Sequence, residues 1–238
     1  MRKKPDRTTE PNPSSETETA ASIIRTIDIL SARFGTPQWK RKDPLDELMV
    51  TLLSQNTNDR NRDRAYEQLR ARFASWEEVL AADVTDIEQT IRSAGLSGQK
   101  SARMKEILGW IKDYFGGLNL DRLNNLDNDE AIKLLTSRKG IGVKTAAVVL
   151  AFAFNRDLCP VDTHVHRIAR RLGWIPEGTS ADSAFGFLNP LIPSGRAAAF
   201  HLNLLKFGRS ICLARKPGCA SCPLRDECRW VGKDNCKS

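Results

Sequence analysis

The segment Ser137-Arg-Lys-Gly-Ile-Gly-Val-Lys-Thr-Ala-Ala-Val-Val-Leu150 joins a basic, glycine-containing turn to an apolar run. Gly140 and Gly142 flank a single residue, and glycines in this alternation let successive backbone N–H groups point the same way at the start of a helix. Such a turn binds anions. Lys144 follows it, in the first turn of the predicted helix, and two basic residues precede it.

Helices are predicted on both sides of this hairpin. Upstream, Asp127 and Glu130 have the spacing of a capping box, and a short apolar run follows them. Downstream, apolar residues recur at helical spacing and predict a buried face, formed by Ala146, Val149, Leu150 and Ala153. The unit is therefore expected to be helix, hairpin, helix.

The hairpin resembles the helix-hairpin-helix of the endonuclease III family of DNA glycosylases, whose motif has the form L-P-G-V-G-x-K-T-A. Lys139 stands in place of the proline, and the stretch Gly-Ile-Gly-Val-Lys-Thr-Ala fits throughout. The resemblance implies that Lys144 is the catalytic amine. It also implies that the surrounding residues contact DNA, namely Gly140, Ile141, Gly142, Val143 and Thr145.

Val161-Asp-Thr-His164 is similar to the family's aspartate motif, which implies that Asp162 is the second catalytic residue and His164 a DNA contact. Eighteen residues of unbroken helix would separate Lys144 from Asp162 by roughly 27 Å. The segment 155–160 ends in a proline and breaks the helix, so we expect the chain to turn back and bring Asp162 to Lys144. Asp162 also fits an ordinary helix N-cap.

Two further loops resemble DNA-contacting segments of the family. Leu53-Ser-Gln-Asn-Thr-Asn-Asp59 is rich in amides, and the resemblance implies that Gln55 or Asn56 enters the DNA at the flipped nucleotide, without deciding between them. Amides at a helix end are also common caps. The second segment has the form Gly-Leu-x-x-x-Lys and implies that Leu96 is a wedge filling the gap left by the extruded base, with Lys100 a further DNA contact.

Four of the six cysteines form a C-terminal pattern, Cys212-x6-Cys219-x2-Cys222-x5-Cys228, while Cys159 and Cys236 fall outside it. Four thiolates in a short segment bind zinc or an iron–sulfur cluster, and their chemistry alone does not decide between the two. The spacing resembles the cluster loop of endonuclease III, which implies a [4Fe-4S] cluster. We expect that cluster to be structural, because base removal transfers no electrons.

The composition favours a polyanionic partner. The chain has 238 residues, a formal charge of +8, a pI near 9.3 and 40% hydrophobic residues, enough to bury a sizeable core. Residues 1–20 carry four basic and four acidic side chains, so the excess charge lies in the folded part. No apolar run is long enough for a signal sequence or a membrane span, and we expect a cytoplasmic, nucleoid-associated protein.

We predict an all-α, two-lobed fold, since no period-2 run occurs. The expected organisation is a disordered tail at 1–20, a helical-barrel domain at 44–157 containing the hairpin, and an iron–sulfur cluster domain made of 21–43 with 158–238. Helices are predicted over 59–73, 76–82, 84–93 and 98–115, and others begin near Ser22 and at Asp43-Pro44.

The resemblance implies a monomeric base-excision-repair enzyme, a bifunctional DNA glycosylase and AP lyase. Its partner would be double-stranded DNA with damaged bases or abasic sites, and its substrates oxidised pyrimidines. Lys144 would attack as a neutral amine and form a Schiff base, and β-elimination would nick the strand. One alternative is a monofunctional uracil or mismatch glycosylase of the same fold, although such relatives commonly lack the lysine. An alternative of another class is a non-catalytic iron–sulfur DNA-binding protein.

Overall fold

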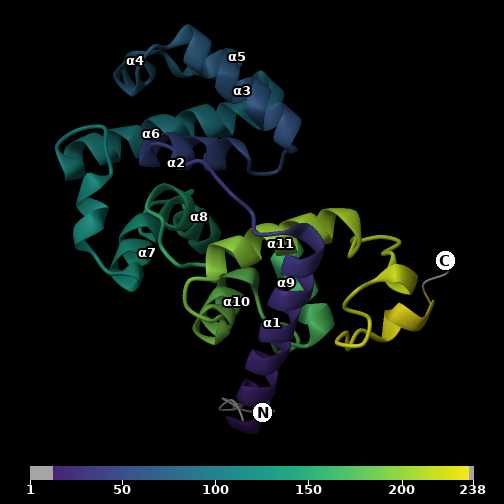
Figure 1. The fold of residues 1–238 in the computed structure, drawn as a ribbon. Coiled ribbons are helices and arrows are strands. Elements are labelled where there is room, and N and C mark those ends of the chain that lie inside the picture. The colour runs from purple at the N-terminus through teal and green to yellow at the C-terminus, as the bar shows by residue number, and fades with distance from the viewer. Residues whose placement is uncertain (1–12, 236–238) are drawn as a thin grey trace, which may run out of the picture. The chain divides into compact units, whose positions relative to one another are not determined.

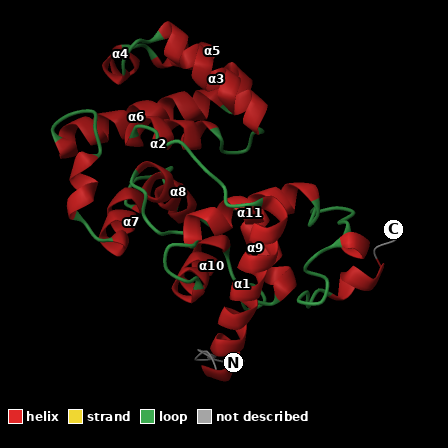
Figure 2. Cartoon of the chain, in the orientation of Figure 1, coloured by secondary structure: helices red, strands yellow, loops and turns green. Residues whose placement is uncertain are grey.

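The computed structural model describes residues 13–235, so residues 1–12 and 236–238, which include Cys236, lie outside the described part. Between residues 13 and 235 the chain forms α-helices, short 3-10 helices and loops, without a strand (Figure 2). The predicted all-α class is therefore confirmed. None of the described helices is long and apolar enough to cross a membrane.

The chain divides into two compact units (Figure 1). Residues 38–160 form one unit, which we call the helical unit. The other unit, which we call the cysteine unit, combines the N-terminal segment up to Pro37 with everything from Val161 onward.

The helical unit contains most of the helices and the predicted hairpin. Its elements are α2 (Pro44–Leu53), α3 (Asp59–Arg72), α4 (Trp76–Ala81), α5 (Val84–Thr90), η1 (Arg92–Ala94), α6 (Ser97–Phe115), η2 (Asp121–Asn125), α7 (Asn128–Thr136) and α8 (Val143–Ala153). The predicted helices over 59–73, 76–82 and 98–115 are each present within two residues. The helix predicted over 84–93 ends at Thr90 and continues as the 3-10 helix η1.

The core of the helical unit is built around α8, which is buried along almost its whole length because most of its residues are alanine or valine. Helix α2 packs against both α8 and α6 (Figure 1). The predicted inner face of α6 is buried as expected, through Met104, Ile107, Leu108, Ile111 and Phe115. Small side chains on α8 let the facing backbone approach closely, so this helix is held rigidly.

Local capping signals define where several helices begin. The Asp43 carboxylate accepts hydrogen bonds from the amides of Leu45 and Asp46 at the start of α2, with Pro44 at the first helical position. Asp127 and Glu130 form the complete capping box of α7. These two predicted helix starts are confirmed at the residues expected.

The chain leaves α8 through a fixed loop. Helix α8 ends at Ala153, and the Arg156 guanidinium donates hydrogen bonds to the carbonyl groups of Leu126 and Asp127, each at 3.0 Å. Burial lowers the pKa of Arg156, and the nearby Asp127 partly opposes that effect. The bonds attach the segment that follows α8 to the start of α7.

The cysteine unit is made of α1 (Pro13–Phe34), α9 (Thr163–Leu172), α10 (Ala181–Leu188), η3 (Asn189–Leu191), α11 (Ala197–Ser210), η4 (Cys219–Ser221) and η5 (Val231–Asn235). Helix α1 begins at Pro13, so it includes residues 13–20 of the segment expected to be disordered. An acidic first turn favours this extension, and Glu18 forms an ion pair with Arg229 at 2.6 Å. Residues 1–12 of the expected tail lie outside the described part.

Helix α1 is joined to the C-terminal segment by a network of polar contacts. Arg25 binds both carboxylate oxygens of Glu227, at 2.7 and 2.9 Å, and holds the pKa of that carboxyl below its usual value. Ser22 donates to Glu227 at 3.0 Å and accepts from the buried Trp174 indole at 3.1 Å. Glu227 precedes Cys228, so α1 fixes one end of the cysteine-rich segment.

Candidate functional site

The glycine hairpin lies between α7 and α8 in the helical unit. Gly140 has φ 95°, and a Cβ atom added there would lie less than 3.0 Å from side-chain atoms of Arg103. Only glycine fits this conformation beside that side chain. Gly140 and Gly142 are exposed, and Lys144 is the second residue of α8, with a half-buried side chain.

Two residues of the hairpin that were expected to contact DNA are buried. Ile141 and Thr145 are 3% and 4% exposed, so any contact that they make with a partner would go through their backbone. Val143 is half-buried. The surface that the hairpin offers to a partner is therefore the backbone around its two glycines, beside the exposed Arg138 and Lys139.

The amide loop, which we define as residues 54–58, meets the hairpin. Gln55 Nε2 donates a hydrogen bond of 3.1 Å to the Gly140 carbonyl oxygen. Asn56 is exposed and has φ 53°, a left-handed conformation that asparagine tolerates better than most residues. Its side chain makes no hydrogen bond to any described residue. The two amides therefore differ, since Gln55 braces the hairpin and Asn56 faces solvent.

The wedge loop, defined as Gly95 and Leu96, carries the expected apolar wedge. Leu96 is 54% exposed and has φ 49° and ψ 34°. A left-handed leucine is strained, and such strain persists only where the surrounding structure imposes it. An open hollow lies between the amide loop and the wedge loop, lined by Asn56, Thr57, Asn58, Asn61, Arg92, Ser93, Ala94 and Gly95.

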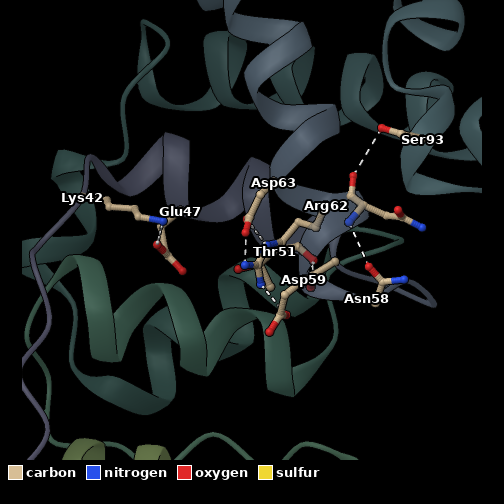
Figure 3. Close-up of polar contacts among 10 residues, drawn as sticks. Lys42, Glu47, Thr51, Asn58, Asp59, Arg62, Asp63 and Ser93 are labelled. Carbon is tan, nitrogen blue, oxygen red and sulfur yellow. Dashed lines mark hydrogen bonds and ion pairs between the residues drawn. The ribbon is translucent and has the colours of Figure 1, made fainter.

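Hydrogen bonds join the two sides of this hollow (Figure 3). Ser93 Oγ donates to the Asn61 carbonyl at 3.3 Å, and the Asn58 side chain accepts from the Asn61 amide at 2.9 Å. Arg62, one residue further along α3, pairs with Asp59 and Asp63 at 2.9 and 2.7 Å. The start of α3 is thus held between the two loops.

Lys100, expected from the sequence to contact DNA, has its ammonium group turned into the helical unit. Its side chain is buried, with the residue only 7% exposed, and Nζ donates hydrogen bonds of 2.8 Å to the carbonyl oxygens of Leu53 and Ala94. A lysine one turn into a helix after an exposed loop resembles a phosphate contact in sequence. Only the folded structure shows that its ammonium group points inward.

Glu47 is a site residue that the sequence did not reveal. It lies on α2 with a side chain 13% exposed, 3.9 Å from Lys42 Nζ (Figure 3). Burial raises the pKa of Glu47, and the positive charges of Lys42, Arg62 and Lys144 act in the opposite direction. A carboxylate thus acts electrostatically on Lys144 from within the helical unit. The feature of the sequence that could have indicated this residue is the position of a glutamate between the core leucines of α2.

Asp162 and His164 belong to the cysteine unit. Asp162 is the N-cap of α9, and its Oδ1 accepts hydrogen bonds of 2.8 Å from the amides of His164 and Val165. The N-cap expected from the sequence is confirmed. His164 is half-buried, and its Nδ1 lies 3.1 Å from the Arg167 guanidinium, which also donates to the Cys212 carbonyl.

The four cysteines of the C-terminal pattern line one cavity in the cysteine unit. The cavity has apolar walls from α9 and α11 as well as four thiols, those of Cys212, Cys219, Cys222 and Cys228. No three metal-binding side chains among residues 13–235 are placed to hold a single metal ion.

The cavity's charge pattern suits a cationic inorganic core. Burial raises the pKa of the Cys222 thiol, and the neighbouring Cys212 and Cys228 raise it further. Arg171 Nη1 donates to Cys212 Sγ at 3.2 Å, and its guanidinium lies 4.3 Å from the Trp230 ring centroid. Several thiolates can be kept together here only with positive charge to stabilise them.

Residues 49–191 match the sequence pattern of the HhH-GPD superfamily of base excision DNA repair proteins. That range is more than half of the chain and contains the hairpin, both loops and Asp162. The chain belongs to this superfamily. Within the superfamily it belongs with the endonuclease III enzymes, as predicted, and its expected enzyme class of DNA glycosylase is confirmed by the relatives described next.

Endonuclease III of Thermotoga maritima is 34% identical over 191 residues, which cover 80% of this chain and 85% of that enzyme. A provisionally named DNA glycosylase of Arabidopsis thaliana is 37% identical over 193 residues, covering 79% of this chain. The chain spans 65% of the length of that plant relative.

Solved structures agree with this assignment. A non-covalent endonuclease III–DNA complex has a TM-score of 0.80 and 29% identity, with 92% of this chain and 99% of that chain covered. A thermostable thymine-DNA glycosylase has a TM-score of 0.70 at 21% identity, with 92% of this chain and 98% of that chain covered. The second likeness shows only that the superfamily fold is shared.

The conformation of Gly140 predicts the effect of adding one methyl group. Gly140→Ala should lower the free energy of unfolding by about 1–3 kcal/mol, because alanine is strained at φ 95° and displaces Arg103. Gly142→Ala is the matched control, since no atom lies within 4 Å of its added Cβ, and a smaller loss is expected. Urea denaturation of both variants measures the difference. Equal stabilities would contradict this account of the hairpin.

The buried carboxyl of Glu47 predicts a pH-dependent effect. Its pKa is raised on folding, so the folded state binds more protons, and stability falls as pH rises through the window above the ordinary glutamate pKa of about 4.3. Glu47→Gln should therefore be more stable than wild type at pH 7, by roughly 1 kcal/mol, and lose that advantage at lower pH.

Urea denaturation at several pH values measures this, with Glu106→Gln on the exposed surface of α6 as the control. A Glu47→Gln variant that is less stable than wild type at pH 7 would show that the surrounding cations outweigh burial.

Proposed function

We propose that this chain is a bifunctional DNA glycosylase and AP lyase that removes oxidised pyrimidines from double-stranded DNA, with Lys144 as the nucleophile. The observation that carries the proposal is the position of Lys144. It is the second residue of α8, directly after a glycine hairpin whose exposed backbone fits a phosphate, inside the region matched by the superfamily. The endonuclease III relatives support the reaction class.

The proposed reaction balances without a co-reactant. The neutral Lys144 amine would bond to the sugar C1′ as the bond from C1′ to the base breaks, and the base would leave with the electron pair and take up a proton. Opening of the sugar gives a Schiff base. Loss of a proton from C2′ then expels the 3′ phosphate by β-elimination. Asp162 would stabilise positive charge developing on the sugar, transfer a proton, or do both.

Different parts of the helical unit would make different kinds of contact with DNA. The hairpin backbone, with Arg138 and Lys139, would bind phosphates. Asn56 is the proposed probing amide, because Gln55 is already engaged with the Gly140 carbonyl. Leu96, exposed and strained, is the proposed wedge. Gln55 and Lys100 would hold these parts in place through their hydrogen bonds to backbone carbonyl groups.

Two other functions remain as alternatives. One is a monofunctional uracil or mismatch glycosylase of the same fold, in which Asp162 would activate water. The presence of Lys144 favours the lyase. A non-catalytic DNA-binding protein is the alternative of another class, and the joint occurrence of Lys144 and Asp162 at the family's positions argues against it.

We also propose that the cysteine unit binds a [4Fe-4S] cluster through Cys212, Cys219, Cys222 and Cys228. These thiols line one cavity, their spacing resembles the family's cluster loop, and a cubane of four irons offers one iron to each thiolate. When bound, the cluster would cross-link the C-terminal segment through its four thiolates. No step of the proposed reaction uses it.

Borohydride trapping tests the function. Wild type should form a covalent adduct with duplexes containing thymine glycol or dihydrouracil and with an abasic duplex, and less or none with uracil opposite guanine. Lys144→Ala should form no adduct. Lys139→Ala, on the same hairpin, should bind DNA more weakly yet still form the adduct.

Each other result has a defined meaning. Base release without an adduct would establish the monofunctional enzyme that depends on Asp162. Tight, salt-dependent DNA binding with no base released from any duplex would establish the non-catalytic protein instead.

Iron and sulfide analysis of anaerobically purified protein tests the cofactor. Wild type should contain about four irons and four sulfides per chain. Cys219→Ala should lose most of them, together with the thiolate-to-iron absorption. Cys159→Ala, which alters a buried cysteine outside the cavity, should retain both. One zinc per chain and no iron would contradict the cluster.

A further inference from the structure

Lys100 is a buried cation held by backbone carbonyl groups. Its Nζ lies 2.8 Å from the oxygens of both Leu53 and Ala94, and it forms no ion pair with a described carboxylate. Burial lowers the pKa of this lysine. A buried charge without a carboxylate partner is unfavourable unless its hydrogen bonds are well made, so this arrangement persists for a specific reason.

The two acceptors are the terminal carbonyls of two helices. Leu53 is the last residue of α2 and Ala94 the last of η1, so both carbonyls lack a partner within their helix. The ammonium group supplies that partner to both, and positive charge at the end of α2 also complements the helix dipole. One side chain thus completes two helix ends that are 41 residues apart in sequence.

Each of these helix ends leads directly into a loop that faces DNA in the proposed function. The amide loop begins one residue after Leu53, and the wedge loop begins one residue after Ala94. Asn56 and Leu96, near the tips, both have a left-handed backbone, with φ 53° and 49°. The open hollow lies between the two loops. Lys100 is therefore tied to the base of both walls of that hollow.

We propose that Lys100 is a positioning residue that holds the amide loop and the wedge loop at one fixed spacing, so that Asn56 and Leu96 enter the duplex together. The inference rests on the proposed function, because it assigns DNA contact to both loops. Without the two hydrogen bonds, each loop would move independently, and the strained backbone at Leu96 could relax. The protein would then have to order both loops while it opens the DNA, which lowers the rate.

Two measurements on the full-length protein test the proposal, with Lys100→Met as the variant. Methionine keeps the length and apolar stem of lysine but donates no hydrogen bond. In hydrogen exchange, the amides of residues 54–58 and 95–97 should exchange at least about tenfold faster than in wild type, with α7 and α8 unchanged. Single-turnover base release from the substrate found by trapping should fall at least about tenfold.

A third measurement separates loop positioning from general damage. Cleavage of a preformed abasic duplex should fall less than base release, because no stacked base has to be extruded there. Lys105→Met is the matched control. Lys105 also lies on α6 and donates to a backbone carbonyl, that of Ala82, which is remote in sequence from both loops. This control should keep wild-type exchange in both loops and wild-type base release.

The outcomes are distinct. Wild-type exchange in either loop of Lys100→Met, or base release no slower than in Lys105→Met, overturns the inference alone. A wild-type protein that releases no base from any duplex overturns the proposed function and this inference with it. If Lys100→Met does not fold, Lys100→Gln, whose shorter side chain loses at least one of the two bonds, is compared in the same way.

Discussion

The packing of α2 against α8 is the contact on which the helical unit depends. Helix α8 is composed mostly of alanine and valine and is buried along most of its length, so it has little freedom to shift. Helix α2 lies against it through its own buried face. Because the end of α2 meets the hairpin through the bond from Gln55 to Gly140, this packing fixes the amide loop, the hairpin and the base of Lys144 together.

Around that rigid pair, backbone carbonyls rather than carboxylates hold the basic side chains that fix the loops. Lys100 binds the carbonyls of Leu53 and Ala94, and Arg156 binds those of Leu126 and Asp127. Carbonyl groups are neutral, so these contacts fix loop ends without consuming the unit's positive charge. The exposed basic residues near the hairpin stay available for an anionic partner.

Much of this architecture could be predicted from the sequence, because its signals are local. Asp43, Asp127 and Asp162 each cap the helix expected, since a cap depends only on the next three residues. The roles of Lys100 and Glu47 could not be predicted in the same way. Their surroundings are formed by residues far away in sequence. From the sequence alone, a lysine or a glutamate on a helix is expected to be exposed to solvent, and only the folded structure shows which elements cover it. The burial of Ile141 and Thr145 could not be predicted for a related reason, since a motif marks a hairpin without showing which side chains turn inward.

The attachment of α1 to Glu227 has a consequence for the order in which the protein is built. Ser22 and Arg25 find their partner more than 200 residues later, and the whole helical unit is synthesised in between. A ribosome would therefore release a helical unit able to collapse on local contacts, while α1 waits without its partners. Helix α1 packs against η3 and α11, which are synthesised before Glu227, so its apolar face can be covered before the polar contacts with Glu227 form. Those polar contacts are therefore the last to fix α1, and they lock a helix that is already packed.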